Sequence, residues 1–345
     1  MEIIYISELT NQLVKMFALA LGGFLLTMAL TPVYTFAAYK YRFWKKPRTT
    51  STTGEALKVF SKLHAAKHQR HIPTMAGIVF VVVILFVTLL ANYSTQQTLL
   101  PLLALLGAAV VGLIDDIINI RGDGTGVSGL RSSIKFGLIC LVSFFAAWYF
   151  YSKLGYTSVH VPFYGIWEIG LWIVPLFVVT AVTTSNAVNI SDGLDGLAGG
   201  LLIIAYGIFG VIALLQGNYG IAGFCLTVVG ALLSYTWFNI YPARFFMGDV
   251  GSFALGMGLG VVAMLTDTLF LLPVIGLVFV IEGGSSLIQV LSKKIRHKKV
   301  FIAAPIHHHL EASGWPETKV TMRFWVVGGV MGFVGLMLAL MGGYI

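Results

Sequence analysis

Charged residues are scarce in this 345-residue chain, where Asp, Glu, Lys and Arg together make up only 10% of the sequence. A typical soluble protein has about 25% charged residues. Hydrophobic residues make up 57% of the chain, and the mean hydropathy is +0.88. So little charge cannot cover the surface of a soluble protein of this size, and part of the surface must therefore contact lipid. The composition excludes a soluble enzyme and a disordered chain.

Cysteine is rarer still, with only two residues, Cys140 and Cys225, each inside an apolar run. Cysteines in such runs are typical of small core residues rather than of a disulfide or a metal pair. Their number excludes a secreted disulfide scaffold. The chain also lacks a Walker-type Gly-x-x-x-x-Gly-Lys-Ser/Thr loop, so nothing in it indicates ATP-driven work.

Long apolar runs, in contrast, are abundant. A membrane-spanning helix needs roughly 20 mostly apolar residues. About ten segments qualify: 17–39, 74–91, 99–114, 134–151, 169–182, 197–215, 221–240, 253–265, 269–290 and 324–341. The runs are continuous rather than alternating, which argues against a β-barrel, and the acidic N-terminal stretch predicts no cleaved signal peptide. We therefore expect one all-α integral membrane domain over residues 1–345, with about ten transmembrane helices.

The basic residues predict the orientation of these helices. Of the 22 Lys and Arg residues, only Lys15 and Lys153 fall on one side of the predicted membrane, and the rest fall on the other. Because basic loops stay in the cytoplasm, the basic side is predicted to be cytoplasmic and both termini periplasmic. The net charge of +8 is then loop charge, and it does not indicate a nucleic-acid partner.

The polar residues that are hardest to place in apolar segments all map to this basic side. They are Asp115, Asp116, Asn186, Asn189, Asp192, Asp195, Asn239, Asp249, His307, His308 and His309. Carboxylates at membrane depth are costly and usually functional. Any one of them alone is explained as an ordinary residue at a helix end, but five acidic residues on one side indicate a shared site.

The spacing of the polar residues indicates how they are used. Asp115 and Asp116 are adjacent, so their side chains on a helix point about 100° apart and suit two different tasks. Between Asn186 and Asp195, polar residues recur at every third position, so the row would wind around a helix and contact an elongated ligand at several points. Asp192 has an alternative role as the N-cap of the helix that follows it.

Asp249 and the three histidines point to phosphate chemistry. Asp249 stands between glycines just before an apolar helix, a place that suits a phosphate and a Mg²⁺ ion, although the string is also typical of a simple turn. Three consecutive histidines cannot easily face one zinc ion, so phosphate binding or proton handling is favoured for them. The pattern predicts a diphosphate reaction at the cytoplasmic face, using carboxylates, a divalent metal and basic groups.

Several motifs then resemble one family. They cover residues 73–77, 115–116, 186–198, 239–243, 245–252, 304–311, 314–317 and 323–325. The chain resembles phospho-N-acetylmuramoyl-pentapeptide transferase, within the polyprenyl-phosphate N-acetylhexosamine-1-phosphate transferase superfamily, from about Pro32 to the last predicted helix. The segment from the histidines to Trp315 is its most specific part.

The resemblance implies a ten-helix enzyme of the bacterial inner membrane whose active site faces the cytoplasm. Such enzymes transfer phospho-N-acetylmuramoyl-pentapeptide from its UDP carrier to undecaprenyl phosphate and release UMP. The lipid product is lipid I, the reaction needs Mg²⁺, and it is the first membrane step of peptidoglycan synthesis. A homodimer is consistent with the resemblance.

The resemblance also implies roles for individual residues. Asp249 and Asp116 would hold Mg²⁺, and Asp115 would orient the lipid phosphate or act as a base. The remaining catalytic positions are Asn189 and His307, and the substrate-binding positions are Thr74, Asp192, Gly193, Leu194, Asp195, Asn239, Phe246, Gln289, His308, His309 and Arg70. Among these, Phe246 would stack on uracil.

The sequence departs from the family pattern in one place. The pattern Lys-x-x-Thr-Pro-Thr-Met-Gly-Gly is represented by a stretch in which Gln69 stands for the lysine and Ile72 for the first threonine. Arg70 or Lys67 would then supply the positive charge from a shifted position.

Two alternative functions remain open from the sequence, beside a scaffold without catalytic activity, against which the retained acidic residues argue. The first is a related transferase that uses UDP-N-acetylglucosamine. The second is a transporter, which is less favoured because transporters bind their substrates near the membrane midplane, whereas the polar residues here gather on one side.

Overall fold

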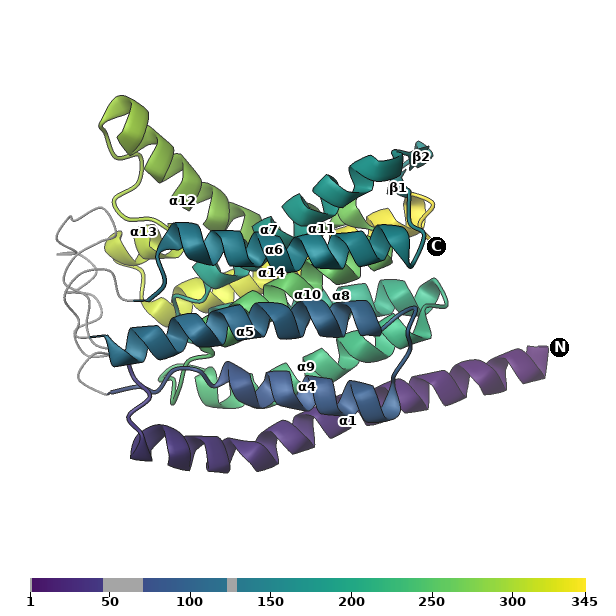
Figure 1. Ribbon diagram of the computed structural model, residues 1–345, viewed down its shortest axis with the longest axis horizontal. Coiled ribbons are helices and arrows are strands. Elements are labelled where there is room, and N and C mark those ends of the chain that lie inside the picture. The colour runs from purple at the N-terminus through teal and green to yellow at the C-terminus, as the bar shows by residue number, and fades with distance from the viewer. Residues whose placement is uncertain (1, 46–70, 123–128) are drawn as a thin grey trace.

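The computed structural model describes residues 2–45, 71–122 and 129–345. Most of these residues form helices that lie side by side along one long axis (Figure 1). The elements in chain order are α1 (Glu2–Lys40), α4 (Gly77–Ala91), α5 (Leu99–Arg121), α6 (Ser132–Ser152), β1 (Ser158–Val161), β2 (Gly165–Glu168), η1 (Gly170–Trp172), α7 (Ile173–Ser191), α8 (Leu197–Leu215), α9 (Tyr219–Asn239), α10 (Gly248–Leu265), η2 (Leu269–Leu271), α11 (Leu272–Ile275), α12 (Leu277–Arg296), α13 (Ile306–Ala312) and α14 (Glu317–Met341).

Eight helices in the described part of the chain are long and apolar enough to cross a membrane. The pair formed by residues 269–275 and α12 would make a ninth, although the two parts meet at an angle of 82°. α4 is apolar but has only 15 residues, fewer than the roughly 20 that a span needs. The chain is thus a multi-pass membrane protein whose described residues form eight or nine span-capable helices, and a tenth span stays a prediction.

Several helices extend beyond the predicted apolar runs. α5 continues past residue 114 to Arg121, so Asp115 and Asp116 lie inside the helix. α7 runs to Ser191, so Asn186 and Asn189 lie on a helix as their spacing predicts, whereas Asp192 and Asp195 lie beyond its C-terminal end. α10 begins at Gly248, so the expectation that Asp249 lies before the helix is wrong by one turn. The site side chains are therefore held mainly by helical backbone.

A small β-hairpin interrupts the helical pattern. β1 and β2 pair antiparallel, with Val159 opposite Trp167 and His160 opposite Ile166. The all-α expectation is confirmed for the other regular elements of the described residues, which are all helices, and the hairpin is a local exception to it. Strands of four residues are far shorter than the runs that predict membrane spans, so they leave no comparable signal. The hairpin lies at the end of the bundle that is remote from α13 (Figure 1).

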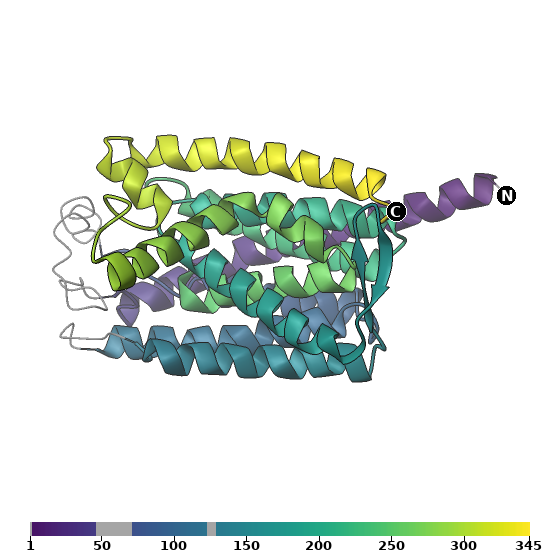
Figure 2. The same cartoon turned by 90° about the horizontal axis from the view of Figure 1, so that it is seen from above.

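α10 is the central helix, because it packs against α5, α7, α4 and α8. All but one of its residues are buried, and the exception is Asp249. α14, in contrast, runs along one edge of the bundle (Figure 2) and has many exposed apolar side chains. Asp249 thus stands at the first turn of the best-packed helix in the described structure.

Two glycines allow neighbouring helices to approach α10 closely. A Cβ atom on Gly112 of α5 would lie 2.6 Å from the backbone nitrogen of Val250. A Cβ atom on Gly256 of α10 would lie 2.6 Å from Cα of Ser185 on α7. Both distances are too short for a real side chain, so glycine is required where α5 and α7 contact α10. The contact at Gly112 brings Asp249 beside Asp115 and Asp116.

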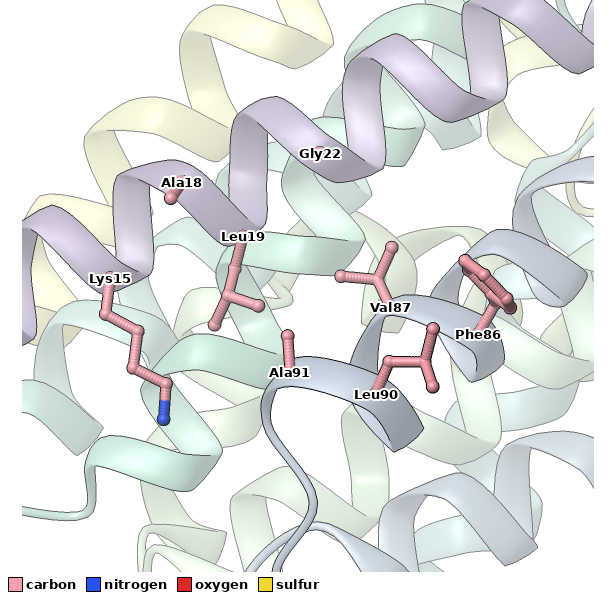
Figure 3. Close-up of a pocket in the computed structure, with 8 residues that line it drawn as sticks. All are labelled: Lys15, Ala18, Leu19, Gly22, Phe86, Val87, Leu90 and Ala91. Carbon is pink, nitrogen blue, oxygen red and sulfur yellow. The ribbon is translucent and has the colours of Figure 1, made fainter.

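The two ends of the bundle differ in content. Both chain termini lie at one end, and α13 with the C-terminal end of α5 lies at the other (Figures 1 and 2). Away from the α13 end, an apolar groove of about 290 Å³ lies between α1 and α4 (Figure 3). Its lining residues are Lys15, Ala18, Leu19, Gly22, Phe86, Val87, Leu90 and Ala91. None of the candidate site residues lines this groove.

Candidate active site

Three carboxylates and two lysines form a compact cluster at the α13 end of the bundle. Lys135 Nζ lies 3.0 Å from Asp115 Oδ2 and 2.8 Å from Asp249 Oδ2. Lys45 Nζ lies 2.8 Å from Asp116 Oδ1 and 3.4 Å from Asp249 Oδ1. Asp249 is therefore the centre of the cluster, with one oxygen facing each ammonium group. Asp115 and Asp116 are almost fully buried, and buried carboxylates of this kind require such positive partners.

The two adjacent carboxylates have different surroundings, as their spacing on a helix predicts. Asp115 Oδ1 accepts a hydrogen bond from the Leu130 backbone at 2.7 Å, and its Oδ2 accepts one from Asn119 Nδ2 at 2.9 Å. Asp116 Oδ2 instead accepts the backbone N–H of Val250 at 3.0 Å. Asp116 is thus fixed to the first turn of α10, while Asp115 faces α6 and the residues that precede it.

The two lysines are site residues that the sequence did not single out. In the sequence, both contribute only to the loop charge that predicts the orientation of the helices. Lys135 lies in the first turn of α6, where a lysine inside an otherwise apolar helix is a usable signal. Lys45 follows α1 in an irregular segment and carries no such signal. Burial lowers the pKa of Lys45, but the Asp249 and Asp116 carboxylates outweigh this effect and hold its pKa above the usual range.

The oxygen atoms of Asp116 and Asp249 suit a hard cation. The ammonium group of Lys45 already lies between them, so this pair of carboxylates accommodates a positive charge. Among the described residues, no group of three or more His, Cys, Asp and Glu side chains is arranged to hold a metal ion. Mg²⁺ is nevertheless commonly bound through one or two carboxylates together with substrate phosphates and water. The donor set of this pair fits that mode.

The end of α7 lies beside the start of α10. Asn189 Nδ2 donates a hydrogen bond to Ser252 Oγ at 2.8 Å, which connects the two helices. Asp192 follows the last turn of α7, and the residue at the N-cap of α8 is Gly196, so the alternative that Asp192 caps α8 is wrong. Burial raises the pKa of Asp192 to about 7, with Lys45 opposing the rise and Asp249 adding to it. Asp192 therefore belongs electrostatically to the carboxylate cluster.

Asp195 and Asn239 use their polar atoms on the backbone of the chain itself. Asp195 Oδ2 accepts the N–H of Ala243 at 2.9 Å. Asn239 Oδ1 accepts the N–H of Gly196 at 3.0 Å, and its Nδ2 donates to Phe245 O at 2.9 Å. These contacts fix the 192–196 segment, which includes Gly193 and the buried Leu194, against the segment before α10. The structure thus gives both residues a clear role in shaping the site.

The segments that contain Thr74 and Phe246 are joined by backbone hydrogen bonds next to the start of α10. The backbone N–H of Phe246 donates to Pro73 O at 2.8 Å, and the N–H of Ala76 donates to Phe246 O at 3.0 Å. The Thr74 side chain is buried. Its hydroxyl oxygen is close to Gly248, since a Cβ atom added to Gly248 would lie 2.9 Å from it. The segments around residues 74 and 246 therefore both border the first turn of α10. Arg70, like Lys67 and Gln69, lies outside the described residues.

Gln289 and the three histidines hold the segment between α12 and α14. Gln289 Oε1 accepts backbone N–H groups from Val300 and Phe301, each at 3.0 Å. The three histidines engage three different partners through Nδ1. His307 contacts Glu282 Oε2 at 2.7 Å, and His308 contacts Glu311 Oε2 at 2.8 Å. His309 accepts the backbone N–H of Ile302 at 3.2 Å. Burial lowers the pKa of His308, and its contact with Glu311 opposes this.

Known proteins with similar sequences identify the family. A family model described as glycosyl transferase family 4 matches residues 98–267. A phospho-N-acetylmuramoyl-pentapeptide-transferase of Chloroflexus aurantiacus (strain ATCC 29366 / DSM 635 / J-10-fl) is 38% identical over 349 residues, covering 97% of this chain and 92% of the relative. Relatives of the same name from Geobacillus sp. (strain WCH70) and Clostridium novyi (strain NT) are 37% and 32% identical, covering 91% and 92% of this chain and 94% of each relative. The chain belongs to the phospho-N-acetylmuramoyl-pentapeptide transferase family.

The residue ranges of these matches can be compared with the positions of the site residues. The glycosyl transferase model spans α5 to α10 and so includes Asp115, Asp116 and Asp249. Lys45, Thr74 and the histidine segment lie outside it. The similarity to the transferases extends over nearly the whole chain, in agreement with a site assembled from both the central helices and the flanking segments.

Proposed function

We propose that this protein transfers phospho-N-acetylmuramoyl-pentapeptide from its UDP carrier to undecaprenyl phosphate, forming lipid I and UMP. The observation that carries the proposal is the cluster of Asp115, Asp116, Asp249, Lys45 and Lys135, in which Asp115 and Asp116 are buried and the other three are partly exposed, in a chain that belongs to a family of this name. We further propose that the α13 end of the bundle faces the cytoplasm of a bacterial inner membrane, because Lys45 and Lys135, which belong to the predicted cytoplasmic set of basic residues, lie there.

The reaction is a single displacement at phosphorus. An oxygen of the lipid phosphate attacks the β-phosphorus of the UDP-sugar, and the bond from that phosphorus to the bridging oxygen breaks. The bridging oxygen leaves with the α-phosphate as UMP. A lipid phosphate is already largely ionised near neutral pH, so the role of Asp115 is to orient the attacking group rather than to remove a proton.

The lysines and carboxylates would balance the phosphate charge and hold the metal ion. Lys135 contacts Asp115 and Asp249, so it lies where the lipid phosphate would approach and would balance its charge. Asp116 and Asp249 would hold Mg²⁺, which when bound neutralises phosphate charge. Asp192, Gly193 and Leu194 would border the nucleotide, with Phe246 stacked on uracil.

A reconstitution assay tests the function directly. Purified protein in detergent, given Mg²⁺ and undecaprenyl phosphate, is expected to release UMP and form a lipid product from UDP-N-acetylmuramoyl-pentapeptide. UDP-N-acetylglucosamine, assayed in parallel, is expected to give no product. Turnover of the glucosamine substrate alone would instead assign the protein to the related transferases.

Metal removal gives a separate prediction. An excess of chelator is expected to reduce transfer to background, because the substrate diphosphate then lacks the divalent cation that would neutralise its charge. Restoring Mg²⁺ is expected to restore the rate in full. Unchanged turnover in chelator would contradict the assignment of Asp116 and Asp249 as metal ligands.

Replacing Lys135 with Met is expected to lower kcat by about 10²-fold, because the substitution removes a preorganised cation from the reacting phosphates. Lys135→Arg keeps the charge and is expected to retain more activity than Lys135→Met. Lys153→Met, at the end of the bundle away from the cluster, is the matched control and is expected to be active. Equal rates for Lys135→Met and the control would refute this role.

A further inference from the structure

A buried acid–histidine pair joins α12 to α13 beside the site. Glu282 Oε2 lies 2.7 Å from His307 Nδ1, and both side chains are almost fully excluded from solvent. A carboxylate at Nδ1 fixes both the orientation of an imidazole ring and the nitrogen that is presented elsewhere. Glu282 itself is too deeply buried to touch a substrate, so its influence must pass through His307.

A second contact strengthens the same junction. Ser285, one turn further along α12, accepts the backbone N–H of Ile306 at 2.9 Å and donates to Glu282 O at 2.9 Å. α13 has only seven residues, too few to be stable without tertiary contacts. Glu282 and Ser285 therefore determine where the first turn of α13 lies.

The opposite edge of the His307 ring packs against Gly193. A Cβ atom on Gly193 would overlap His307 Nε2 and would lie 2.8 Å from Cε1. The ring is thus enclosed between the Glu282 carboxylate and the backbone of the 192–195 segment. His308 and His309 have a different arrangement, since their Nδ1 atoms engage Glu311 and the Ile302 N–H of their own segment.

We propose that Glu282 is a positioning residue that acts through His307 on the 192–195 segment. The order of contact is Glu282, then the His307 ring, then the Gly193 backbone. In this arrangement Glu282 determines the position of the 192–195 segment, which forms the wall of the nucleotide site. The inference rests on the proposed function, which places the nucleotide against Asp192, Gly193 and Leu194.

The first test separates nucleotide binding from chemistry. Glu282→Ala is expected to raise KM for the UDP-sugar and the Kd for UMP by about tenfold, since small displacements of a binding wall have effects of this size. Because the carboxylate cluster is untouched, kcat is expected to change by less than about threefold. Glu282→Gln still offers a hydrogen bond to Nδ1 and is expected to restore most of the affinity. Titration calorimetry with UMP and steady-state assays supply these readouts.

A size-compensation experiment tests the contact with Gly193. Gly193→Ala inserts a methyl group into the space of the His307 ring and is expected to weaken UMP binding by about tenfold or more. His307→Ala removes the ring, so the double variant is expected to bind UMP better than Gly193→Ala alone. Additive losses in the double variant would overturn the proposal, whether or not Glu282→Ala folds.

A control variant separates a loss of stability from a loss of UMP affinity, and the wild type tests the proposed function itself. Gln216 makes two hydrogen bonds, to Thr266 O at 2.9 Å and Tyr344 O at 3.0 Å, at the end of the bundle that holds the C-terminus. Gln216→Ala is expected to lower thermal stability without changing the Kd for UMP. If Glu282→Ala behaves in the same way, the positioning role is refuted. If the wild type neither transfers the sugar nor binds UMP, the proposed function fails instead.

Discussion

Replacing Asp249 with Asn is expected to reduce kcat by at least about 10³-fold. Asp249 is the carboxylate that faces both Lys45 and Lys135, and an amide there removes the charge that holds the two ammonium groups. Stabilisation of phosphate charge by a bound cation is worth several kcal/mol, and each loss of about 1.4 kcal/mol slows a reaction tenfold. The measurement is UMP release under saturating substrate.

The control for this substitution is Asp267→Asn. Asp267 follows α10 at its other end, where Oδ1 accepts the His160 N–H at 2.9 Å. Asn keeps an acceptor at that position, so near wild-type turnover is expected. If Asp249→Asn retained more than a tenth of the wild-type rate, Asp249 would not be the centre of the reaction.

Replacing Gly112 with Ala is expected to damage both stability and activity. The added methyl group would lie 2.5 Å from the carbonyl carbon of Asp249 and 2.6 Å from the nitrogen of Val250. Backbone atoms cannot rotate away as a side chain can, so α5 and α10 must separate. Overpacking of this kind costs about 1–3 kcal/mol and sometimes more, and a displacement of about 1 Å at a site can cost about 10² in rate.

The matched control is Gly137→Ala on α6, where an added methyl group meets nothing within 4 Å. Alanine also favours a helix more than glycine does, so this control is expected to melt at or above the wild-type temperature. Thermal unfolding in detergent and UMP release should be measured on both variants. Equal stability of the two would show that α5 and α10 are not in the close contact described.

The carboxylates were the most predictable part of the site. Charged groups are so rare in apolar segments that Asp115, Asp116 and Asp249 stand out in the sequence, and the structure brings all three together. Their helical setting was less predictable, because apolar runs define only the lipid-compatible part of a helix. A helix continues through polar residues when other helices bury them, as α5 does.

The lysines and the backbone contacts could not be read from the sequence. Lys45 looks like an ordinary loop charge, and Lys135 differs from one only in standing at the start of an apolar helix. Only the fold shows that both lysines lie between carboxylates that are far apart in the sequence. Asp195, Asn239 and Gln289 have the side-chain chemistry of ligand contacts, yet each is bonded to backbone groups of the chain. Pattern alone does not distinguish a side chain that binds a ligand from one that shapes a loop.

The central place of α10 also bears on how such a protein adapts to different lipids. The most apolar stretch of α10 is 94% buried, whereas those of α1 and α14 are only 22% buried. Bilayer thickness and composition act on the residues that touch lipid. Residues on the outer helices can therefore be replaced to suit a membrane of different thickness. The helix that carries Asp249 does not need to change, because its residues do not touch lipid.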